Sequence, residues 1–371
     1  MIASPKKISF AGPSVTDHEV KTVTDAVLNG FYENYTKHTL LLEEKIRNYL
    51  GVKHVIATHC CTVALHAAAV ALDLGPGDEV IIPDISWVAT AYAVAYTGAT
   101  CVFVDIDPNT WCIHPEAIEQ AITSKTKAIM LVHTFGHPAD MDSIMRIAKA
   151  YNLSVIEDAA PSLGSRYKGQ LVGTQGDISC FSFQGAKLTV SGEGGIICTN
   201  NSSLYEKLKL ICSMGRTDSN AVFWSDQIGY QYTIANLTAA MALAQVERID
   251  ELLDIKKRIY LRYLEGLSGL SSYFKLLSSA SDCESNYCYP SLMLADSVKV
   301  SRDEILLYLK KLNVHARPAF PRMSQFPVFQ ERFSNPVATK VALKGISLPA
   351  AANLSSSDID FVCQCLKSIV S

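Results

Sequence analysis

The chain has 371 residues, of which 49% are hydrophobic and 19% charged, a composition typical of a globular protein that can bury a sizeable core, with two lobes expected. A net charge of −3 gives no reason to expect nucleic acid or a membrane surface as a partner. No apolar run reaches transmembrane length and no secretion signal is recognisable, so we expect a cytoplasmic protein. The 11 cysteines are expected to be reduced thiols, and none of their spacings predicts a metal site.

Helices and strands are predicted to alternate through the first part of the chain. Residues 17–50 are predicted to be helical with a break at Asn29-Gly30, and Gly75-Pro76-Gly77-Asp78 marks a turn. The predicted strands are 54–57, 79–82, 101–105, 128–132 and 154–158, and the predicted helices between them are 62–72, 115–122 and 141–151. This alternation favours an α/β fold with a mostly parallel sheet and helices on both faces.

The pattern changes in the last third of the chain. Residues 236–268 are predicted to form one long helix that leads out of the large lobe. The elements predicted beyond it are a strand at 287–295, a helix at 302–312 and a strand at 314–316. We therefore assign residues 1–250 to a large lobe and residues 251–371, including the linking helix, to a smaller α+β lobe.

Lys187 and Asp158 are the first candidates for chemistry. Lys187 follows an apolar, β-rich run and is framed by small residues, while Asp158 closes the predicted strand 154–158. Ligands of parallel sheets bind beyond the carboxyl ends of strands. A lysine that holds a carbonyl cofactor as a Schiff base, with a carboxylate that keeps a pyridinium nitrogen protonated, is what pyridoxal phosphate (PLP) requires. The plainer alternatives are a solvated surface lysine and a turn aspartate.

Further residues are predicted to complete a cofactor site. Cys61-Thr62 begins the predicted helix 62–72, so backbone N–H groups and the Thr62 hydroxyl are expected to bind a phosphate. Ser182 is expected to add a hydroxyl to the same phosphate, and Trp87 to stack on the cofactor ring. Thr62 also fits an ordinary helix N-cap, and Trp87 also fits a core aromatic residue.

The sequence closely resembles the sugar aminotransferases of the DegT/DnrJ/EryC1/StrS family, which are PLP-dependent enzymes of fold type I. The motifs that carry this resemblance over nearly the whole chain are Gly75-Pro76-Gly77-Asp78-Glu79-Val80-Ile81-Ile82-Pro83, Val132-His133-Thr134-Phe135-Gly136-His137, Glu157-Asp158-Ala159-Ala160, Gly176-Asp177, Phe181-Ser182-Phe183, Lys187, Gly192-Glu193-Gly194-Gly195 and Gly229-Tyr230-Gln231-Tyr232. The resemblance implies a large lobe with a mostly parallel seven-stranded sheet flanked by helices, and a smaller α+β C-terminal lobe.

The resemblance also implies roles for single residues. It places Lys187 as the Schiff-base lysine and proton carrier, Asp158 at the pyridine nitrogen, Thr62 and Ser182 at the phosphate, Trp87 on the ring, and Asn236 at the phosphate of the neighbouring subunit. A homodimer with shared active sites and L-glutamate as amino donor follow from it. Within the family, the spacing before the lysine and the stretch from Phe223-Trp224 to Tyr232 most resemble enzymes that aminate C4 of GDP-4-keto-6-deoxymannose.

Several positions depart from the family pattern. Cys61 stands where glycine is usual, Ala186 where asparagine is usual, and Pro321-Arg322 replaces a His-Pro pair. Pro161 is a candidate substrate-side residue and stands where a polar side chain near the cofactor and substrate is usual. Arg317 and Arg322 are candidates to bind a phosphate or carboxylate of the substrate, or else are solvated surface arginines.

The acceptor of the amino group therefore stays open. A small phosphorylated ketone or a non-nucleotide keto-sugar is an alternative to the nucleotide-linked sugar. A PLP-dependent sugar 3-dehydratase is a further alternative, although Lys187 argues against it because that branch of the family has histidine in its place. A PLP-binding protein without catalytic activity is the remaining one.

Overall fold

The central sheet organises the larger part of the molecule. The structure, a computed structural model, describes residues 6–216 and 223–370. Within these residues, seven strands form one sheet in the order β1-β9-β8-β5-β4-β2-β3. They are β1 (His54–Thr58), β2 (Glu79–Pro83), β3 (Thr100–Val104), β4 (Thr126–Val132), β5 (Ser154–Asp158), β8 (Ile178–Ser182) and β9 (Gly195–Thr199). Of these, β9 alone runs opposite to the other six, which confirms the predicted mostly parallel, seven-stranded sheet.

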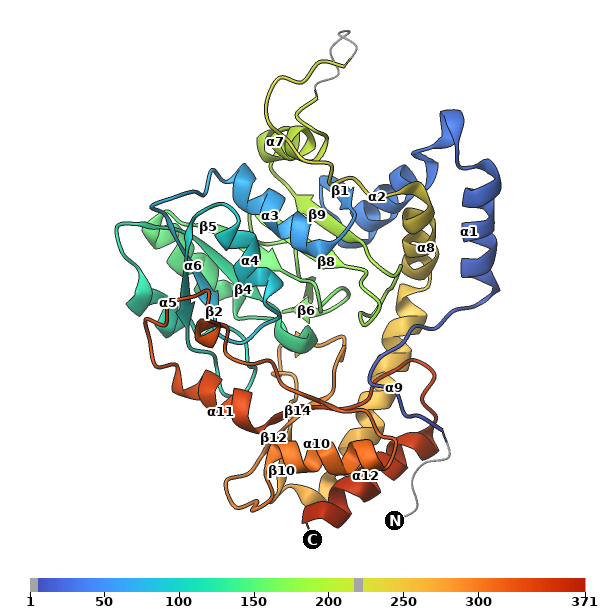
Figure 1. Ribbon diagram of the computed structural model, residues 1–371, viewed down its shortest axis with the longest axis vertical. Helices are drawn as coiled ribbons and strands as arrows, with labels where there is room; N and C mark the ends of the chain where they lie inside the picture. The colour runs from blue at the N-terminus through green and yellow to red at the C-terminus, as the bar shows by residue number, and fades with distance from the viewer. Residues whose placement is uncertain (1–5, 217–222, 371) are drawn as a thin grey trace.

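Helices cover both faces of this sheet (Figure 1). One face packs against α3 (Cys61–Ala71), α4 (Ala89–Ala95) and α7 (Ser202–Cys212), and the other against α2 (Lys37–Leu50), α5 (Pro115–Ala121), α6 (Met141–Tyr151) and α8 (Asn236–Glu247). Val80 and Ile82 of β2 point to the first face and Ile81 to the second, so residues 80–82 are apolar without a break because both faces are covered. In the described ranges, no helix is long and apolar enough to cross a membrane.

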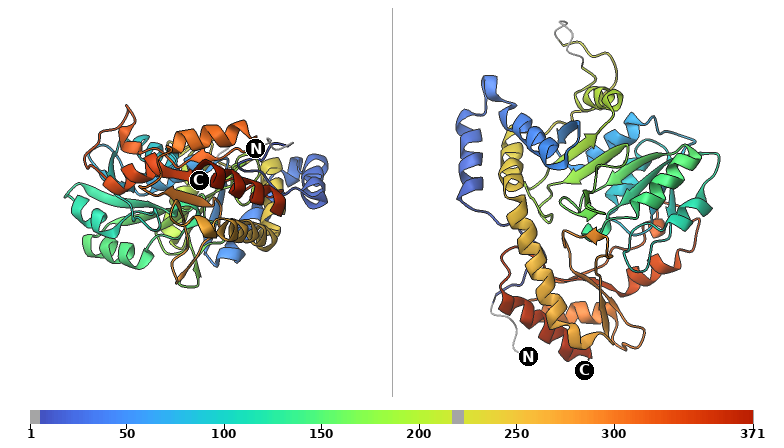
Figure 2. Two further views of the ribbon diagram at one scale, coloured as in Figure 1. Left: turned by 90° about the horizontal axis from the view of Figure 1, so that it is seen from below. Right: turned by 180° about the vertical axis from the view of Figure 1, so that it is seen from behind.

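The smaller part is built on a second, antiparallel sheet. Its strands, in order, are β10 (Phe274–Leu276), β12 (Ser291–Leu294), β14 (Gly345–Ser347) and β13 (Arg317–Pro318). The helices of this part are α9 (Ile249–Gly266), α10 (Arg302–Lys311), α11 (Pro336–Lys344) and α12 (Ser356–Val370). A three-stranded sheet of β11 (Cys283–Glu284), β6 (Arg166–Tyr167) and β7 (Gln170–Leu171) joins the two parts. Figure 2 shows from behind how α9 runs from the large sheet to the small one.

Three predicted elements are wrong in detail, and one of them is the strand predicted at 287–295, of which only Ser291–Leu294 (β12) is a strand. The long helix predicted at 236–268 is two helices, α8 and α9, which meet at Arg248. The Arg248 guanidinium donates to Glu19 (Nη1 to Oε1, 2.5 Å) in helix α1 (Asp17–Asn29), a contact that local sequence does not reveal. The strand predicted at 314–316 is a single bridge between Val314 and Ile8, and β13 begins only at residue 317.

The N-terminal segment runs along the small sheet. The Ile8 carbonyl accepts a hydrogen bond from the His315 N–H (3.0 Å), and the Phe10 carbonyl accepts one from the Ala350 N–H (2.7 Å). Ile8 belongs to the hydrophobic core of the smaller part. The division of the chain into two lobes near residue 250 stays a prediction. Residues 8 and 10 were assigned to the first predicted lobe, but they contact the second.

Helix α1 and helix α2 flank the predicted break at Asn29-Gly30, which the structure confirms with a short 3₁₀ turn, η1 (Tyr32–Asn34), between them. In α2, Glu43 Oε1 accepts a hydrogen bond from the Ala57 N–H of β1 (2.8 Å). Burial raises the pKa of Glu43 to about 7, and the bond from Ala57 and the charge of Arg47 offset only part of this effect.

Candidate active site

One cavity of about 730 Å³ lies where the carboxyl ends of the central strands meet the smaller part. Its wall is built from β5, the loop after β8, the start of α3, the N-terminal segment and β13. The predicted site residues that line it are Cys61, Thr62, Trp87, Asp158, Pro161, Ser182, Lys187 and Arg317. Residues distant in sequence, predicted separately, are therefore brought to one site.

Asp158 ends β5 as a buried carboxylate in the cavity wall. Its Oδ2 accepts a hydrogen bond from the Thr90 hydroxyl (2.7 Å), and its Oδ1 accepts one from the Ala160 N–H (3.2 Å). Burial raises the pKa of Asp158, and these two bonds together with the charge of Lys187 offset only part of the effect. Among the described residues, no cation forms an ion pair with Asp158. A cationic ligand group in the cavity would supply the missing positive charge.

The neighbouring strand-end residues have structural roles. Asp105 accepts backbone N–H groups at the start of α11. His133 Nε2 lies 2.9 Å from Glu157 Oε2, and both side chains are fully buried. Although burial alone raises the pKa of Glu157, the hydrogen bonds from His133 and from backbone N–H groups at residues 173–176 outweigh it and lower the pKa. Of these strand-end side chains, Asp158 is the one that lines the cavity.

Helix α3 opens into the cavity at its N-terminus. Its N-cap residue is Cys60, which makes no side-chain capping bond, so the N-cap interpretation of Thr62 is wrong. The first N–H groups of α3 and the Thr62 hydroxyl are thus available to an anion. Burial raises the pKa of the Cys61 thiol well above its usual range, so the cysteine that replaces the usual glycine adds no negative charge here.

Gly195 is one glycine of the motif after Lys187 at which a side chain would collide with the backbone. A Cβ atom on Gly195 would lie 2.6 Å from the carbonyl carbon of Cys60 and 2.7 Å from the nitrogen of Cys61. No side chain fits there, so glycine allows β9 to pass directly against the start of α3. Ser182 is the partner of Gly195 in the sheet, which brings its hydroxyl to the same region.

Lys187 lies in the loop that follows β8. The Lys187 N–H donates to the Gln184 carbonyl (2.8 Å), and the Gly185 N–H donates to the Gly192 carbonyl (3.2 Å). The buried side chains of Phe183 and Leu188 anchor the loop on either side. The amine of Lys187 therefore sits on a short, hydrogen-bonded loop at the cavity wall.

Trp87, shortly before α4, and Arg317, in β13 of the small sheet, both line the cavity. Trp87 is 62% exposed, which excludes the core-aromatic interpretation and leaves its indole face available to a ligand ring. The guanidinium carbon of Arg317 lies 4.4 Å from the ring centre of Phe10, a cation–π contact that holds the charge at the cavity.

Arg322 and Asn236 are not brought to this cavity. Arg322 is buried and donates to Asp84 (Nε to Oδ2, 2.8 Å) in a network just after β2 of the large sheet. The Asn236 side chain accepts from the His38 N–H (2.8 Å) and donates to the Gly30 carbonyl (3.1 Å). Its predicted reach to a neighbouring subunit stays a prediction, and would require these two bonds to be released.

Two lining residues were missed from sequence. Thr90, which holds Asp158, stands three residues after Trp87, so a hydroxyl one helical turn beyond the candidate aromatic residue was the available signal. Tyr289 donates to the Ala186 carbonyl (2.8 Å) across 103 positions of sequence, and no local pattern indicates this contact.

Comparison with known proteins identifies the family of the chain. The family model of the DegT/DnrJ/EryC1/StrS aminotransferases matches residues 13–367. The chain is 36% identical over 367 residues to the GDP-perosamine synthase of Escherichia coli O157:H7, covering 99% of each chain. It is also 36% identical over 366 residues to the GDP-perosamine synthase of Caulobacter vibrioides, covering 98% of each.

Solved structures extend the likeness to the fold. The chain matches the PMP form of Spr1654 from Streptococcus pneumoniae, described as a sugar aminotransferase, with a TM-score of 0.92 at 26% identity over 98% of each chain. The PLP form of the same protein matches with a TM-score of 0.91, covering 98% of this chain and 99% of that one. The full-length match confirms the predicted fold class and the resemblance read from the motifs. The chain belongs to the DegT/DnrJ/EryC1/StrS aminotransferase family.

Proposed function

We propose that in this PLP-dependent aminotransferase Lys187 and Asp158 are the catalytic residues. The observation that carries the proposal is a buried carboxylate, Asp158, that lacks a cationic partner among the described residues and shares a cavity with Lys187. The donor set fits PLP. Asp158 would face the pyridinium, the open start of α3 with Thr62 and Ser182 would hold the phosphate, and Trp87 would cover the ring.

Each residue has a defined task in this proposal. PLP, when bound, supplies an electron sink for the carbon that loses a proton. Asp158 holds the proton on the ring nitrogen, and the Thr90 hydroxyl fixes the carboxylate in place. The Lys187 amine would anchor the cofactor, move a proton from the α-carbon of the amino donor to the cofactor in the first half-reaction, and move one from the cofactor to the acceptor carbon in the second. Trp87 shields one face of the ring from water.

The donor we propose is L-glutamate, and the acceptor is a nucleotide-linked 4-keto-6-deoxy sugar such as GDP-4-keto-6-deoxymannose, aminated at C4. The identity to two GDP-perosamine synthases along the full chain supports this choice. So does the charge of the cavity, because Lys7 and Arg317 line it and form no ion pair with described acidic residues. A diphosphate has the complementary charge. Pro161 contributes an apolar wall, with its carbonyl held by Asn286 Nδ2 (2.9 Å).

We also propose that the enzyme is a homodimer. Large apolar side chains are exposed on the surface of α1, η1 and α2, which Figure 1 shows beside α8. They include Leu28 (73% exposed), Tyr32 (88%) and Tyr35 (68%). An apolar surface of this kind marks a protein interface. Asn236 lies directly behind it, bound to Gly30, which favours a shared site. Light scattering of the purified protein at several concentrations measures the oligomeric state.

The test of the reaction begins with the donor. Adding L-glutamate to the PLP-loaded protein is expected to abolish the visible absorbance of the bound cofactor and to release 2-oxoglutarate once per site, whereas Lys187→Ala is expected to do neither. A wild-type protein that binds PLP but releases no 2-oxoglutarate would reject L-glutamate as the amino donor.

The acceptor is tested separately. The glutamate-treated protein is offered GDP-4-keto-6-deoxymannose, other nucleotide-linked 4-keto sugars, non-nucleotide keto-sugars and small phosphorylated ketones, and products are identified by mass spectrometry. Nitrogen is expected at C4 of a nucleotide-linked sugar. Amination of a non-nucleotide acceptor alone, or a deoxy-keto product without nitrogen, would reject the proposed acceptor.

A further inference from the structure

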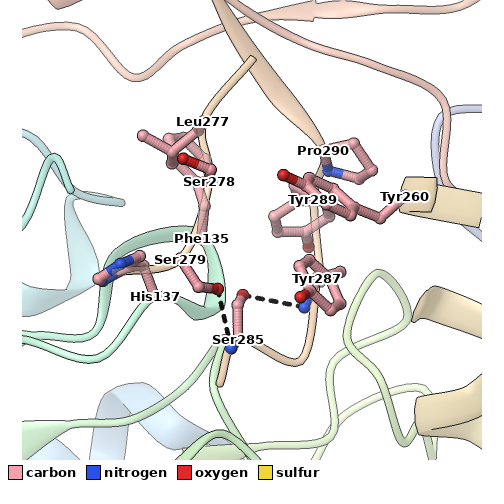
Figure 3. Close-up of a pocket in the computed structure, with 10 residues that line it drawn as sticks. All are labelled: Phe135, His137, Tyr260, Leu277, Ser278, Ser279, Ser285, Tyr287, Tyr289 and Pro290. Atoms are coloured by element: carbon pink, nitrogen blue, oxygen red, sulfur yellow. Dashed lines mark hydrogen bonds between the residues drawn. The ribbon is translucent and has the colours of Figure 1, made fainter. Parts of the chain in front are cut away.

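Tyr289 is a buried residue of the smaller part that reaches the active-site cavity. It stands two positions before β12 and lines both the large cavity and a small neighbouring pocket. In Figure 3, Tyr289 and Tyr287 come from the same segment and border that pocket, which Phe135 also lines. Tyr289 thus lies at the junction between the large sheet and the small one.

Two aromatic rings fix the position of Tyr289. Its ring is stacked on Phe10, with centres 5.1 Å apart and planes 17° apart, and it meets Phe135 edge-on at 6.0 Å. These contacts leave the ring little freedom and aim the hydroxyl at the Ala186 carbonyl, which accepts its hydrogen bond at 2.8 Å. Burial raises the pKa of Tyr289 well above its usual range, so the hydroxyl keeps the proton that it donates.

The acceptor of this bond belongs to the peptide that carries Lys187. The carbonyl of Ala186 and the nitrogen of Lys187 share one rigid plane, so a bond to the carbonyl restrains the direction in which the lysine leaves the backbone. On the other side, the Lys187 N–H donates to the Gln184 carbonyl (2.8 Å), a bond within the loop itself. The large lobe therefore holds one edge of this peptide, and the smaller part holds the other.

We propose that Tyr289 is a positioning residue that ties the orientation of the Lys187 side chain to the docking of the smaller part. The inference rests on the proposed role of Lys187 as the catalytic amine. Tyr289 acts through Ala186 and does not need to contact the cofactor or the substrate. When the smaller part moves away from the central sheet, the Ala186 carbonyl loses its donor and the lysine loop gains freedom.

The test compares two phenylalanine variants. Tyr289→Phe keeps the ring and removes the hydrogen bond. Tyr287→Phe is the matched control, because Tyr287 is two positions away, its ring is stacked on Tyr260 at 4.2 Å, and no hydrogen bond links it to Ala186. Circular dichroism and thermal unfolding establish that both variants are folded.

The first readout needs neither cofactor nor substrate. Amide hydrogen exchange of residues 184–190 in the PLP-free protein is expected to be roughly two- to tenfold faster in Tyr289→Phe, the range that one net hydrogen bond predicts. Exchange in the rest of the chain, and throughout Tyr287→Phe, is expected to match the wild type.

The second readout uses the PLP-loaded protein. In Tyr289→Phe, the pH midpoint of the visible absorbance is expected to shift, and the maximal rate with glutamate is expected to fall roughly two- to tenfold at unchanged half-saturation. Wild-type exchange at 184–190 together with an unshifted midpoint in Tyr289→Phe would overturn the inference, as would equal effects in Tyr287→Phe. A wild-type protein inert toward glutamate would instead reject the proposed amino donor, while the exchange experiment would still decide whether Tyr289 restrains the loop.

Discussion

Replacing Arg322 by methionine is expected to weaken the fold and to leave the reaction at Lys187 intact. Arg322 was a candidate substrate residue from sequence, but its side chain is 5% exposed and its Nε lies 2.8 Å from Asp84 Oδ2. Asp84 is fully buried at the end of β2 and also accepts from the Ser324 N–H (2.8 Å) and from Asn335 Nδ2 (2.9 Å). Arg322 is the cation of this buried network.

The size of the effect follows from the charge that is left behind. Removing one partner of a buried ion pair leaves the other charge uncompensated, which costs about 3–5 kcal/mol of unfolding free energy. A protein of this kind has only about 5–15 kcal/mol in total, so the loss is readily measured. Methionine fills much of the arginine volume, so the loss reports on charge more than on packing. Asp84→Asn in the same chain removes the stranded charge and is expected to restore part of the lost stability.

The assay is urea unfolding followed by circular dichroism, with donor turnover measured on the folded protein. Arg317→Met is the matched control, because Arg317 was predicted on the same grounds but is exposed and lines the cavity. It is expected to change stability by less than about 0.5 kcal/mol and to raise the half-saturation concentration of the acceptor. Arg322→Met is expected to change neither half-saturation concentration. A stable Arg322→Met protein with weakened acceptor binding would refute the reasoning and assign Arg322 to the substrate.

Three further perturbations test other parts of the site and the fold. Gly195→Ala is expected to displace the start of α3 and to weaken PLP binding at least tenfold by equilibrium titration, whereas Gly269→Ala, which meets no atom within 4 Å, should bind normally. Thr90→Val removes the 2.7 Å bond to Asp158, so the pKa of Asp158 should rise further and the acidic limb of the pH–rate profile should move up by about one unit. An unmoved limb would contradict the role of Thr90 in holding the Asp158 carboxylate. The folded-state pKa of Glu43 is raised from 4.5 to about 7, so the wild type should lose stability as the pH rises through this window, whereas Glu43→Gln should not. The same pH dependence of the melting temperature in both proteins would disprove this.

Much of the large lobe could be predicted from the sequence because its strands are buried on both faces. Such strands appear as continuous apolar runs, and β2 to β5 were each predicted to within two residues. The end of α8 could not be predicted in this way. Residues 236–268 have an uninterrupted helical pattern, and the turn at Arg248 is held by Glu19 and by the N-terminal segment. Contacts between residues this far apart in the chain leave no periodic pattern of apolar residues in the sequence.

Some site residues could likewise be predicted from the sequence, and others depend on tertiary packing. Lys187, Asp158 and Thr62 were predicted from sequence because each follows a strand or opens a helix at the edge where parallel sheets bind ligands, and the structure brings all three to one cavity. Arg317 and Arg322 could not be told apart from sequence. Burial against an acidic partner is a property of the packed chain, and it sends one arginine to the cavity and the other to Asp84.

By itself, therefore, the sequence determined the type of fold, the family and most of the predicted residues that line the cavity, because local apolar patterns and short motifs encode these. The tertiary structure alone decided that Asp158 depends on Thr90, that Gly195 must lack a side chain, and that Tyr289 reaches the peptide before Lys187. Each of these depends on the approach of segments far apart in the chain, and such distances are set only when the central and small sheets pack together.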